Sequence, residues 1–318
     1  MNSLADFSPE LQNLLNGISP LPHLGVIQAQ GEDAANFLHN QLSNDVLLLP
    51  VGQSRLAAFC SAKGRMQASF ILVKTAPDTV LLVLSLDLLA QTLKRLSMFV
   101  LRAKVKMSDA TSQWQLRGLM GDSARAAVGQ AAPWQTMAQE GAHAVALYPA
   151  VLGESRIPRA LWIAPAGHAL PAGADAPTDV WQWAEVMSGV TLVSQPVFEA
   201  FVPQMLNYES VGGVNFKKGC YPGQEVVARS QFRGTLKRRT ALVHSPVDLA
   251  SGQDIFTPAD PEQPCATVVL CAARPHGQGF DALVSGTTES MQTGWRVGRA
   301  EGEALDILPL PYNLLADI

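Results

Sequence analysis

The 318-residue chain has few cysteines, and their arrangement excludes several common kinds of site. Its four cysteines are too few for a disulfide scaffold at this length. Because no two of them form a C-x-x-C pair, a zinc knuckle or a thioredoxin-type centre is disfavoured. An iron–sulfur cluster bound by this chain alone would need most of these cysteines to converge. We therefore expect no metal in the isolated chain. The cysteines are Cys60, Cys220, Cys265 and Cys271.

Long apolar runs and targeting segments are also missing. The N-terminus has no basic segment ahead of an apolar one. The longest apolar run, residues 80–90, is interrupted by Asp87 and is too short to span a bilayer. With 47% hydrophobic and 16% charged residues, the chain can bury a large core and is long enough for two or three domains. We expect a globular, cytoplasmic protein that does not bind membranes.

Standard catalytic motifs are absent as well. The sequence contains no phosphate-binding P-loop, no nucleophile elbow, no H-E-x-x-H metalloprotease motif and no G-x-G-x-x-G dinucleotide fingerprint after a strand. The six histidines lack the spacing of metal ligands. No familiar enzyme class is indicated by these patterns.

Hydrophobic periodicity predicts an α+β fold. Alternating and helical patterns predict a helix at 32–42, a hairpin of strands 56–60 and 66–73, a strand at 80–86, a helix capped by Asp87 and running to Met98, and a strand at 99–107. From about residue 238 onward, helical periodicity gives way to short strands separated by Gly, Pro and Asp, which predicts a small β-barrel or sandwich. These strands are expected at 242–245, 266–272, 282–285, 294–297 and 304–307.

One stretch, "NFKKGCYPGQEVVARSQFRG" at 215–234, has mutually supporting residue types around a thiol. Gly219 and Gly223 permit turns or close backbone approach, and two lysines that precede Cys220 favour a thiolate if they lie near the sulfur. The alternative is an inert, buried cysteine in a turn. Charged and glycine-rich flanks make a functional, accessible thiol as credible as that alternative, whereas the other three cysteines lie in apolar, strand-like runs and are expected to be buried.

Cations are concentrated in the same region. An even distribution of Lys and Arg would place about two between residues 216 and 240, whereas seven occur there against a single acid, Glu225. Such a cluster on a chain of net charge −4 indicates either a solvated face or a site for an anion. Because aromatic platforms are not evident, a small anion is favoured over nucleic acid. The cations are Lys217, Lys218, Arg229, Arg233, Lys237, Arg238 and Arg239.

The segment K-G-C-Y-P-G-Q-E at 218–225 resembles the K-G-C-Y-x-G-Q-E signature of the YgfZ family, the folate-binding relatives of the glycine-cleavage T-protein. The resemblance extends over nearly the whole chain. It implies a T-protein-like multidomain fold around a central folate channel, ending in a β-barrel, and a role in maintaining iron–sulfur enzymes, including enzymes that thiolate tRNA. The collinear segments are 31–45, 63–66, 211–213, 228–229, 232–234 and 308–312.

The resemblance also implies site residues. Cys220 corresponds to the functional thiol, and the bound ligand would be tetrahydrofolate or a derivative. Leu24 occupies an early-strand position where family members often carry a tryptophan, and loss of that ring could remove about 1 kcal/mol of pterin contact. The expected folate contacts are Trp181, Lys217, Lys218, Tyr221, Gln224, Glu225 and Arg229.

Departures from the T-protein pattern disfavour aminomethyl transfer. T-proteins carry an acidic pair where this chain has Ala68 and Ser69, and a pterin-recognising Glu where it has Met187. General acid or base assistance needs a group that can hold and release a proton, which Ala and Met cannot do and a Ser hydroxyl does poorly at neutral pH. The sequence therefore leaves open whether the protein is an enzyme, while arguing against an aminomethyltransferase.

We expect a folate-binding accessory protein for the assembly or repair of iron–sulfur enzymes, with those enzymes or assembly factors as partners. Two alternatives remain: a folate-dependent one-carbon transferase, and a tRNA-binding module that uses the basic run. Since the chain has a pI of about 5.9, direct nucleic-acid binding is expected to be weak or absent. The expected domains are residues 1–50 plus 108–235 (folate-binding), 51–107 (sheet plus helix) and 236–318 (β-barrel).

Overall fold

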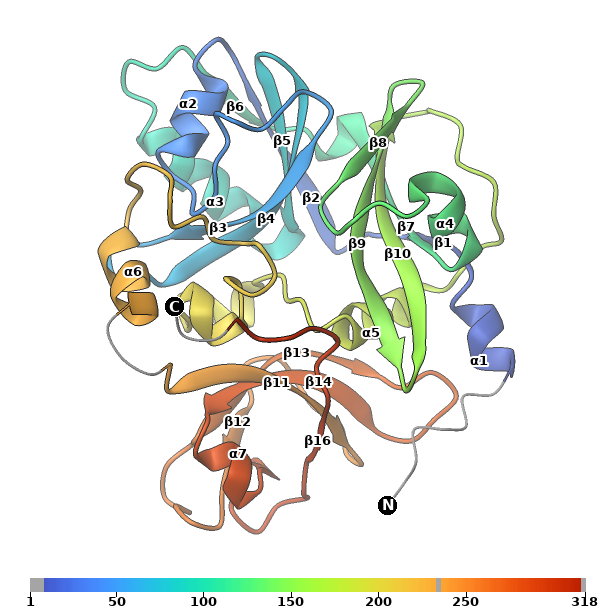
Figure 1. Cartoon of the computed structure of the whole chain (residues 1–318), viewed down its shortest axis with the longest axis vertical. Helices are drawn as coiled ribbons and strands as arrows, with labels where there is room; N and C mark the ends of the chain where they lie inside the picture. Colours follow the sequence, from blue (N-terminus) through green and yellow to red (C-terminus); the bar gives the residue numbers. More distant parts are fainter. Residues whose placement is uncertain (1–8, 233–235, 316–318) are drawn as a thin grey trace.

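The computed structural model describes residues 9–232 and 236–315, which form three β-sheets around a shared centre (Figure 1). We refer to them as the N-terminal, middle and C-terminal sheets. Each is built from antiparallel neighbours, as expected where short loops and hairpins join successive strands. Within the part of the chain that the structure describes, no helix is long and apolar enough to cross a bilayer.

The N-terminal sheet has the strand order β3-β4-β5-β2-β6. Its central strands are buried on both faces, because α3 packs against β2, β5 and β6 while other segments cover the opposite face. Such strands need continuous apolar runs, which the Leu- and Val-rich sequences supply. The bounds are β2 Leu24–Gln30, β3 Ser54–Cys60, β4 Met66–Ala76, β5 Thr79–Ser85, β6 Lys106–Asp109, α2 Ala34–His39 and α3 Leu86–Met98.

The middle sheet has the order β1-β7-β10-β9-β8, and α4 packs against it. Helix α5 contacts β9 of this sheet and also β13 and β14 of the C-terminal sheet, so it lies where the two sheets meet (Figure 1). The bounds are α1 Pro9–Leu14, β1 Gly17–Pro20, η1 Thr111–Gln113, β7 Trp114–Met120, α4 Asp122–Val128, β8 Thr136–Gln139, β9 Ala142–Leu152, β10 Ser155–Pro165 and α5 Thr178–Met187.

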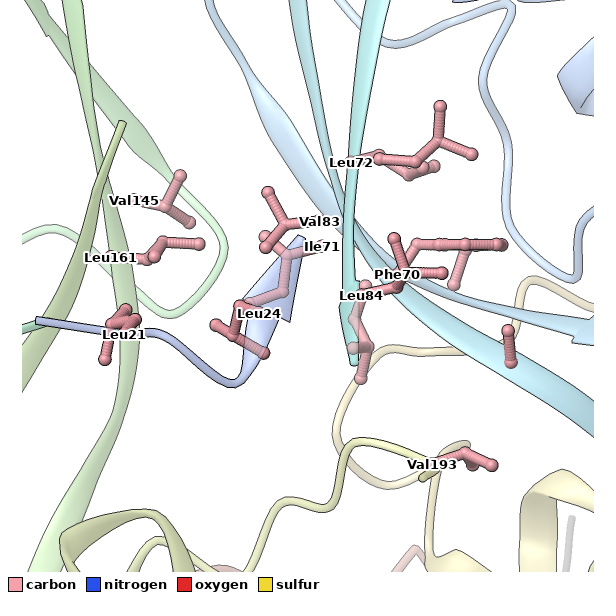
Figure 2. Packing of buried hydrophobic residues seen from close by; sticks show 14 of the residues in the cluster. Leu21, Leu24, Phe70, Ile71, Leu72, Val83, Leu84, Val145, Leu161 and Val193 are labelled. Atoms are coloured by element: carbon pink, nitrogen blue, oxygen red, sulfur yellow. The ribbon is translucent and has the colours of Figure 1, made fainter. Parts of the chain in front are cut away.

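One hydrophobic core joins the sheets. Leu24 at the start of β2 lies between the strands of the N-terminal sheet, including Val83, and residues Val145 and Leu161 of the middle sheet (Figure 2). All four side chains are at most 5% exposed. The two sheets therefore share buried apolar surface, which fixes the connection between them.

The C-terminal sheet is a curled, open half-barrel with the order β15-β12-β13-β14-β11-β16. The prediction of a closed barrel was wrong. The two edge strands are only two and three residues long, and among the described residues no ladder pairs them with each other. The isolated bridge nearby joins Arg296 of β15 to Ala304, which lies before β16. The bounds are β11 Arg238–Ser245, β12 Asp254–Phe256, β13 Ala266–Ala273, β14 Phe280–Thr287, α7 Ser290–Thr293, β15 Arg296–Val297 and β16 Asp306–Leu308.

Three further elements follow α5 along the chain, before the first strand of the C-terminal sheet: η2 Gln195–Val197, η3 Pro203–Leu206 and α6 Gln224–Phe232. Helix α6 stands beside the N-terminal sheet, near the hairpin that joins β3 to β4 (Figure 1). The segment that leads into α6 contains the cysteine signature.

Most predicted elements are confirmed, with shifted ends, but one strand is not. Residues 99–107 alternate in polarity, yet only Lys106–Asp109 is a strand, and Leu101 is 87% exposed. Of that apolar face, Ala103, Val105 and Met107 still pack against the hydrophobic core, so most of this segment covers the core without forming a strand. The helix that follows β5 begins at Leu86 after Ser85, so Asp87 lies in its first turn and accepts a hydrogen bond from Ser85 Oγ at 2.7 Å.

The division into domains stays a prediction. The N-terminal sheet takes β2 from before residue 51, and β6 runs across residue 107. Strands on both sides of those two predicted boundaries therefore hydrogen-bond within a single sheet.

Candidate functional site

Cys220 is exposed on a loop that is tied to the β3–β4 hairpin. The loop approaches the hairpin so closely at Gly223 (φ +80°) that a Cβ there would stand 2.3 Å from the Ser61 carbonyl oxygen. On the hairpin side of the same contact, a Cβ on Gly64 would stand 2.9 Å from Val226 Cβ at the start of α6. Only glycine fits this contact. The two glycines thus explain how the thiol is held on the surface by a fixed loop.

Lys218 anchors the same loop from the inside. Its side chain is buried, and Nζ donates to the carbonyl oxygens of His39 at 2.6 Å and Leu42 at 3.0 Å, at the end of α2. The ammonium also lies 4.7 Å from the centre of the Tyr221 ring. Burial lowers the pKa of Lys218 to about 8, while the charges of Asp45 and Cys220 raise it. The ammonium therefore points inward and still interacts electrostatically with the thiol.

A histidine and a carboxylate, which the sequence did not single out, complete the surroundings of the loop. His39 Nδ1 lies 3.4 Å from Asp45 Oδ1, and both side chains are about nine-tenths buried. The other ring nitrogen, Nε2, would stand 3.5 Å from a Cβ on Gly219, the residue before Cys220. Burial, followed by the Lys218 charge, lowers the pKa of His39, and Asp45 opposes both effects.

The 215–217 segment also borders an open cleft of about 540 Å³. Phe216 and Phe232 meet edge to face with ring centres 5.4 Å apart, and Phe232 is half exposed. Aromatic rings, two cations and two amide side chains surround the cleft, which is suited to a planar ligand with anionic groups. The lining residues are Asn44, Arg55, Trp134, Gly212, Val214, Asn215, Phe216, Lys217 and Phe232.

Trp181 lies in a different, buried cluster. It is 1% exposed, Arg159 stacks on its ring at 4.3 Å, and a Cβ on Gly118 would stand 2.3 Å from the ring. Arg159 Nη2 lies 3.7 Å from Glu185 Oε1, and burial lowers the pKa of Arg159 to about 10. Trp181 Nε1 and Arg159 Nε have no hydrogen-bond partner within residues 9–232 and 236–315. The structure does not bring Trp181 together with the cysteine loop.

The remaining predicted contacts are divided between the core and the surface. Tyr221 is buried, which raises its pKa. Gln224, Glu225 and Arg229 lie on α6, where Arg229 Nη2 is 3.3 Å from Glu225 Oε1 in an exposed pair that contributes little to stability.

The basic run does not form one continuous cationic face. Arg239 is buried against Glu209, and Arg238 donates to the Cys265 carbonyl oxygen at 2.8 Å. Arg233 lies outside the described residues. The cations that border the cleft, Lys217 and Arg55, come from segments far apart in the sequence.

The other cysteines differ from Cys220. Cys60 is buried, as predicted, and burial raises its pKa to about 12. Cys265 and Cys271 are half-buried, so the prediction that they are buried was wrong. Their thiols donate to the carbonyl oxygens of Ile255 at 3.4 Å and Leu249 at 3.2 Å. Among the residues that the structure covers, no cluster of three His, Cys, Asp or Glu side chains is arranged to hold a metal.

The positions of the missing acidic groups are occupied by structural side chains. Ser69 is fully buried and its Oγ accepts a hydrogen bond from the Val193 N–H at 2.8 Å. Ala68 and Met187 are buried in the core. None of the three offers a carboxylate to a bound ligand.

Comparison with known proteins places these features in a family. Residues 16–152 match the model of the GCVT N-terminal domain. The tRNA-modifying protein YgfZ of Edwardsiella ictaluri is 30% identical over 259 residues, 75% of either chain. The tRNA-modifying protein YgfZ of Photorhabdus laumondii is 26% identical over 302 residues, covering 91% of this chain and 90% of the relative.

A solved structure shows the same fold. The glycine cleavage system aminomethyltransferase T from Bartonella henselae superposes with a TM-score of 0.70 over 96% of this chain and 88% of its own, at 16% identity. This likeness confirms the expected T-protein-like fold.

Proposed function

The chain belongs to the YgfZ family, and from that membership we propose that it is a folate-binding accessory protein that supports the assembly or repair of iron–sulfur enzymes, including enzymes that modify tRNA. Cys220 is its functional thiol in this proposal. The relatives are named for tRNA modification, which supports the choice of client enzymes.

The observation that carries the proposal is the exposure of Cys220 on a loop whose neighbouring side chains are buried. The thiol is exposed, whereas Lys218, two residues before it, and Tyr221, directly after it, are buried and anchor the loop. An accessible thiol on a fixed loop can react with a partner without a large ordering cost. A structural cysteine would instead be expected inside the core, as Cys60 is.

The residues around the cleft fit a folate. Trp134, Phe216 and Phe232 supply aromatic surface for a pteridine or aminobenzoate ring. Asn215 supplies an amide NH2 group, and Lys217 and Arg55 supply cations for the glutamate carboxylates. Trp181 has an unpartnered donor, but its ring is enclosed by Gly118 and Arg159. We therefore place the proposed folate at the cleft, beside the loop that carries Cys220.

Folate binding is tested by titrating the purified protein with tetrahydrofolate and following heat and tryptophan fluorescence. We expect saturable binding that weakens with salt, because the tail contacts are ionic. Trp134→Phe should remove most of the fluorescence change, whereas Trp162→Phe, in the core of the middle sheet, serves as the matched control. An absence of both heat and fluorescence change at high ligand concentration would rule out the folate part of the proposal.

The same preparation separates an accessory role from one-carbon transfer. An aminomethyl donor with tetrahydrofolate should release no formaldehyde equivalent above background, since Ala68, Ser69 and Met187 provide no carboxylate. Catalytic turnover would favour the transferase instead.

The thiol part is tested in a bacterial strain that lacks its own YgfZ protein. We expect the wild-type chain and Cys271→Ser to restore the activity of iron–sulfur enzymes, and Cys220→Ser to fail although it accumulates to the same level. Restoration by Cys220→Ser would show that the thiol is dispensable.

A further inference from the structure

A second cavity, of about 360 Å³, lies between α3, strands β3 and β4, and the segment that follows η2. Its volume is within the range of small-molecule sites. The side chains that line it include none of those that border the cleft beside the loop of Cys220. This cavity is therefore separate from the site proposed for folate.

Hydrogen bonds fix α3 against η2 at one side of the cavity. Gln91 of α3 donates through Nε2 to Gln195 Oε1 at 2.6 Å, and the Gln195 N–H donates to Asp87 Oδ2 at 3.0 Å. The residues that follow η2, Phe198 and Glu199, both line the cavity. Because these contacts hold the two walls in place without a ligand, binding would carry little ordering cost.

Glu199 has a strained backbone and a carboxylate that is oriented by a buried amide. Its φ of +56° lies in the left-handed region, which is unfavourable for a residue other than glycine. Gln67 Nε2 donates to Glu199 Oε1 at 2.7 Å. Gln67 is 4% exposed, and its Oε1 has no hydrogen-bond partner within residues 9–232 and 236–315. A buried acceptor without a donor needs an explanation, and a ligand that donates hydrogen bonds at this wall would supply one.

Two cations line the same cavity from α3. Lys94 and Arg95 are consecutive and exposed, and Glu199 is exposed as well. In the part of the chain that the structure covers, no ion pair joins Glu199 to either cation. The cavity therefore has two positive charges and one negative charge that do not neutralise one another. The complementary ligand carries two negative charges and one positive charge.

We propose that this cavity binds a free acidic amino acid, aspartate or glutamate. The ligand's ammonium group pairs with Glu199, and its two carboxylates pair with Lys94 and Arg95. Phe198 offers apolar surface to the methylene groups. A dicarboxylate without an amine would leave Glu199 unpaired, and an amino acid with one carboxylate would leave one of the cations unpaired. The site goes beyond the proposed folate and thiol functions and does not rest on them.

The test is calorimetric titration of the full chain with L-glutamate and L-aspartate. We expect saturable binding of at least one of them that weakens with salt. Glutarate, which lacks the ammonium, and L-glutamine, which lacks one carboxylate, should bind about tenfold more weakly or worse, because each loses a charge-assisted contact. An absence of heat with both acidic amino acids would overturn the proposal, and so would equal affinity for glutamate and glutarate.

Substitutions assign the contacts. Glu199→Gln keeps an oxygen that can accept from Gln67 Nε2 but removes the charge, so it should lower the affinity for glutamate by about tenfold and abolish the preference over glutarate. Arg95→Gln should weaken both ligands alike. Arg102→Gln, an exposed cation beyond α3 that does not line the cavity, is the matched control and should bind like wild type. An unchanged preference in Glu199→Gln, with a melting temperature equal to wild type, would contradict the proposed pairing.

A competition experiment separates this site from the folate site. Saturating tetrahydrofolate should leave the affinity for glutamate unchanged, since the two cavities share no lining residue. Displacement of glutamate by tetrahydrofolate would show that the amino acid occupies the place of the folate tail, and would overturn a separate site. Failure of tetrahydrofolate to bind would refute the folate part of the proposed function and leave the binding of acidic amino acids intact.

Discussion

Replacing Lys218 by Met should destabilise the protein more than any other lysine substitution in the loop. The change removes an ammonium that donates to two buried carbonyl oxygens, those of His39 and Leu42, and leaves both without that donor. Each hydrogen bond from a charged group contributes about 1.5–3 kcal/mol. The cost of burying the ammonium, which lowers its pKa to about 8, offsets part of this sum. We expect a net loss of about 2–4 kcal/mol in the free energy of unfolding.

The assay is urea denaturation of Lys218→Met beside Lys217→Met. Lys217 is the matched control because its side chain is exposed, and among the described residues its one hydrogen bond is from the backbone N–H to Asn215 Oδ1 at 2.8 Å. Its replacement should change stability by less than about 0.5 kcal/mol. If the two variants unfold at the same urea concentration, the hydrogen bonds of the Lys218 ammonium do not stabilise the loop.

The pH dependence of the stability difference between wild type and Lys218→Met is an independent test of the burial of Lys218. In the unfolded chain Lys218 keeps its proton up to its ordinary pKa of 10.5, whereas in the folded protein it loses the proton near pH 8. Between these values the unfolded state binds more protons, so the wild type gains stability with rising pH relative to Lys218→Met. The deficit of the variant should therefore be larger near pH 10 than at pH 7, and a deficit that shrinks over this range would contradict the burial of the ammonium.

Further substitutions test the packing of the scaffold away from the cysteine loop. Gly118→Ala should cost about 1–3 kcal/mol, because its methyl group would stand 2.3 Å from the Trp181 ring, whereas Gly219→Ala, whose methyl group meets nothing closer than 3.5 Å, should be nearly neutral in thermal melts. Asp281→Asn should cost about 3–5 kcal/mol, because this fully buried carboxylate accepts hydrogen bonds from Trp183 at 2.7 Å and from Arg274 at 3.0 Å; denaturation that matches wild type would show that the cluster contributes nothing.

Local patterns favoured an accessible and a buried Cys220 about equally, and the resemblance to a family with a functional thiol decided for the accessible one; the structure shows it exposed. Glycines and charges within five residues of the thiol set its surroundings, and the same turn chemistry predicted the β3–β4 hairpin at Gly64. The apolar runs of β4 and β5 likewise carry their own signal, because strands buried on both faces need continuous apolar sequence.

Contacts between distant segments could not be predicted in this way. The hydrogen bond from Lys218 to His39 spans 179 positions, and no periodicity marks His39 or Asp45 as members of a site. The buried pair of Arg239 with Glu209 looks, in sequence, like part of a basic surface. Residues 99–107 alternate as a strand does, but β2 ends at Gln30, which pairs with Lys106, so within the described chain residues 99–105 have no strand ladder to join.

The central claim is that Cys220 is the chemically active thiol of this protein. The most direct measurement is the alkylation rate of all four cysteines in one native sample at neutral pH, with mass-spectrometric readout. We predict that Cys220 reacts at least about tenfold faster than Cys265 and Cys271 and that Cys60, whose pKa burial raises to about 12, reacts slowest. Equal, slow labelling of all four cysteines would contradict the claim and would mean that the signature serves only the turn that precedes α6.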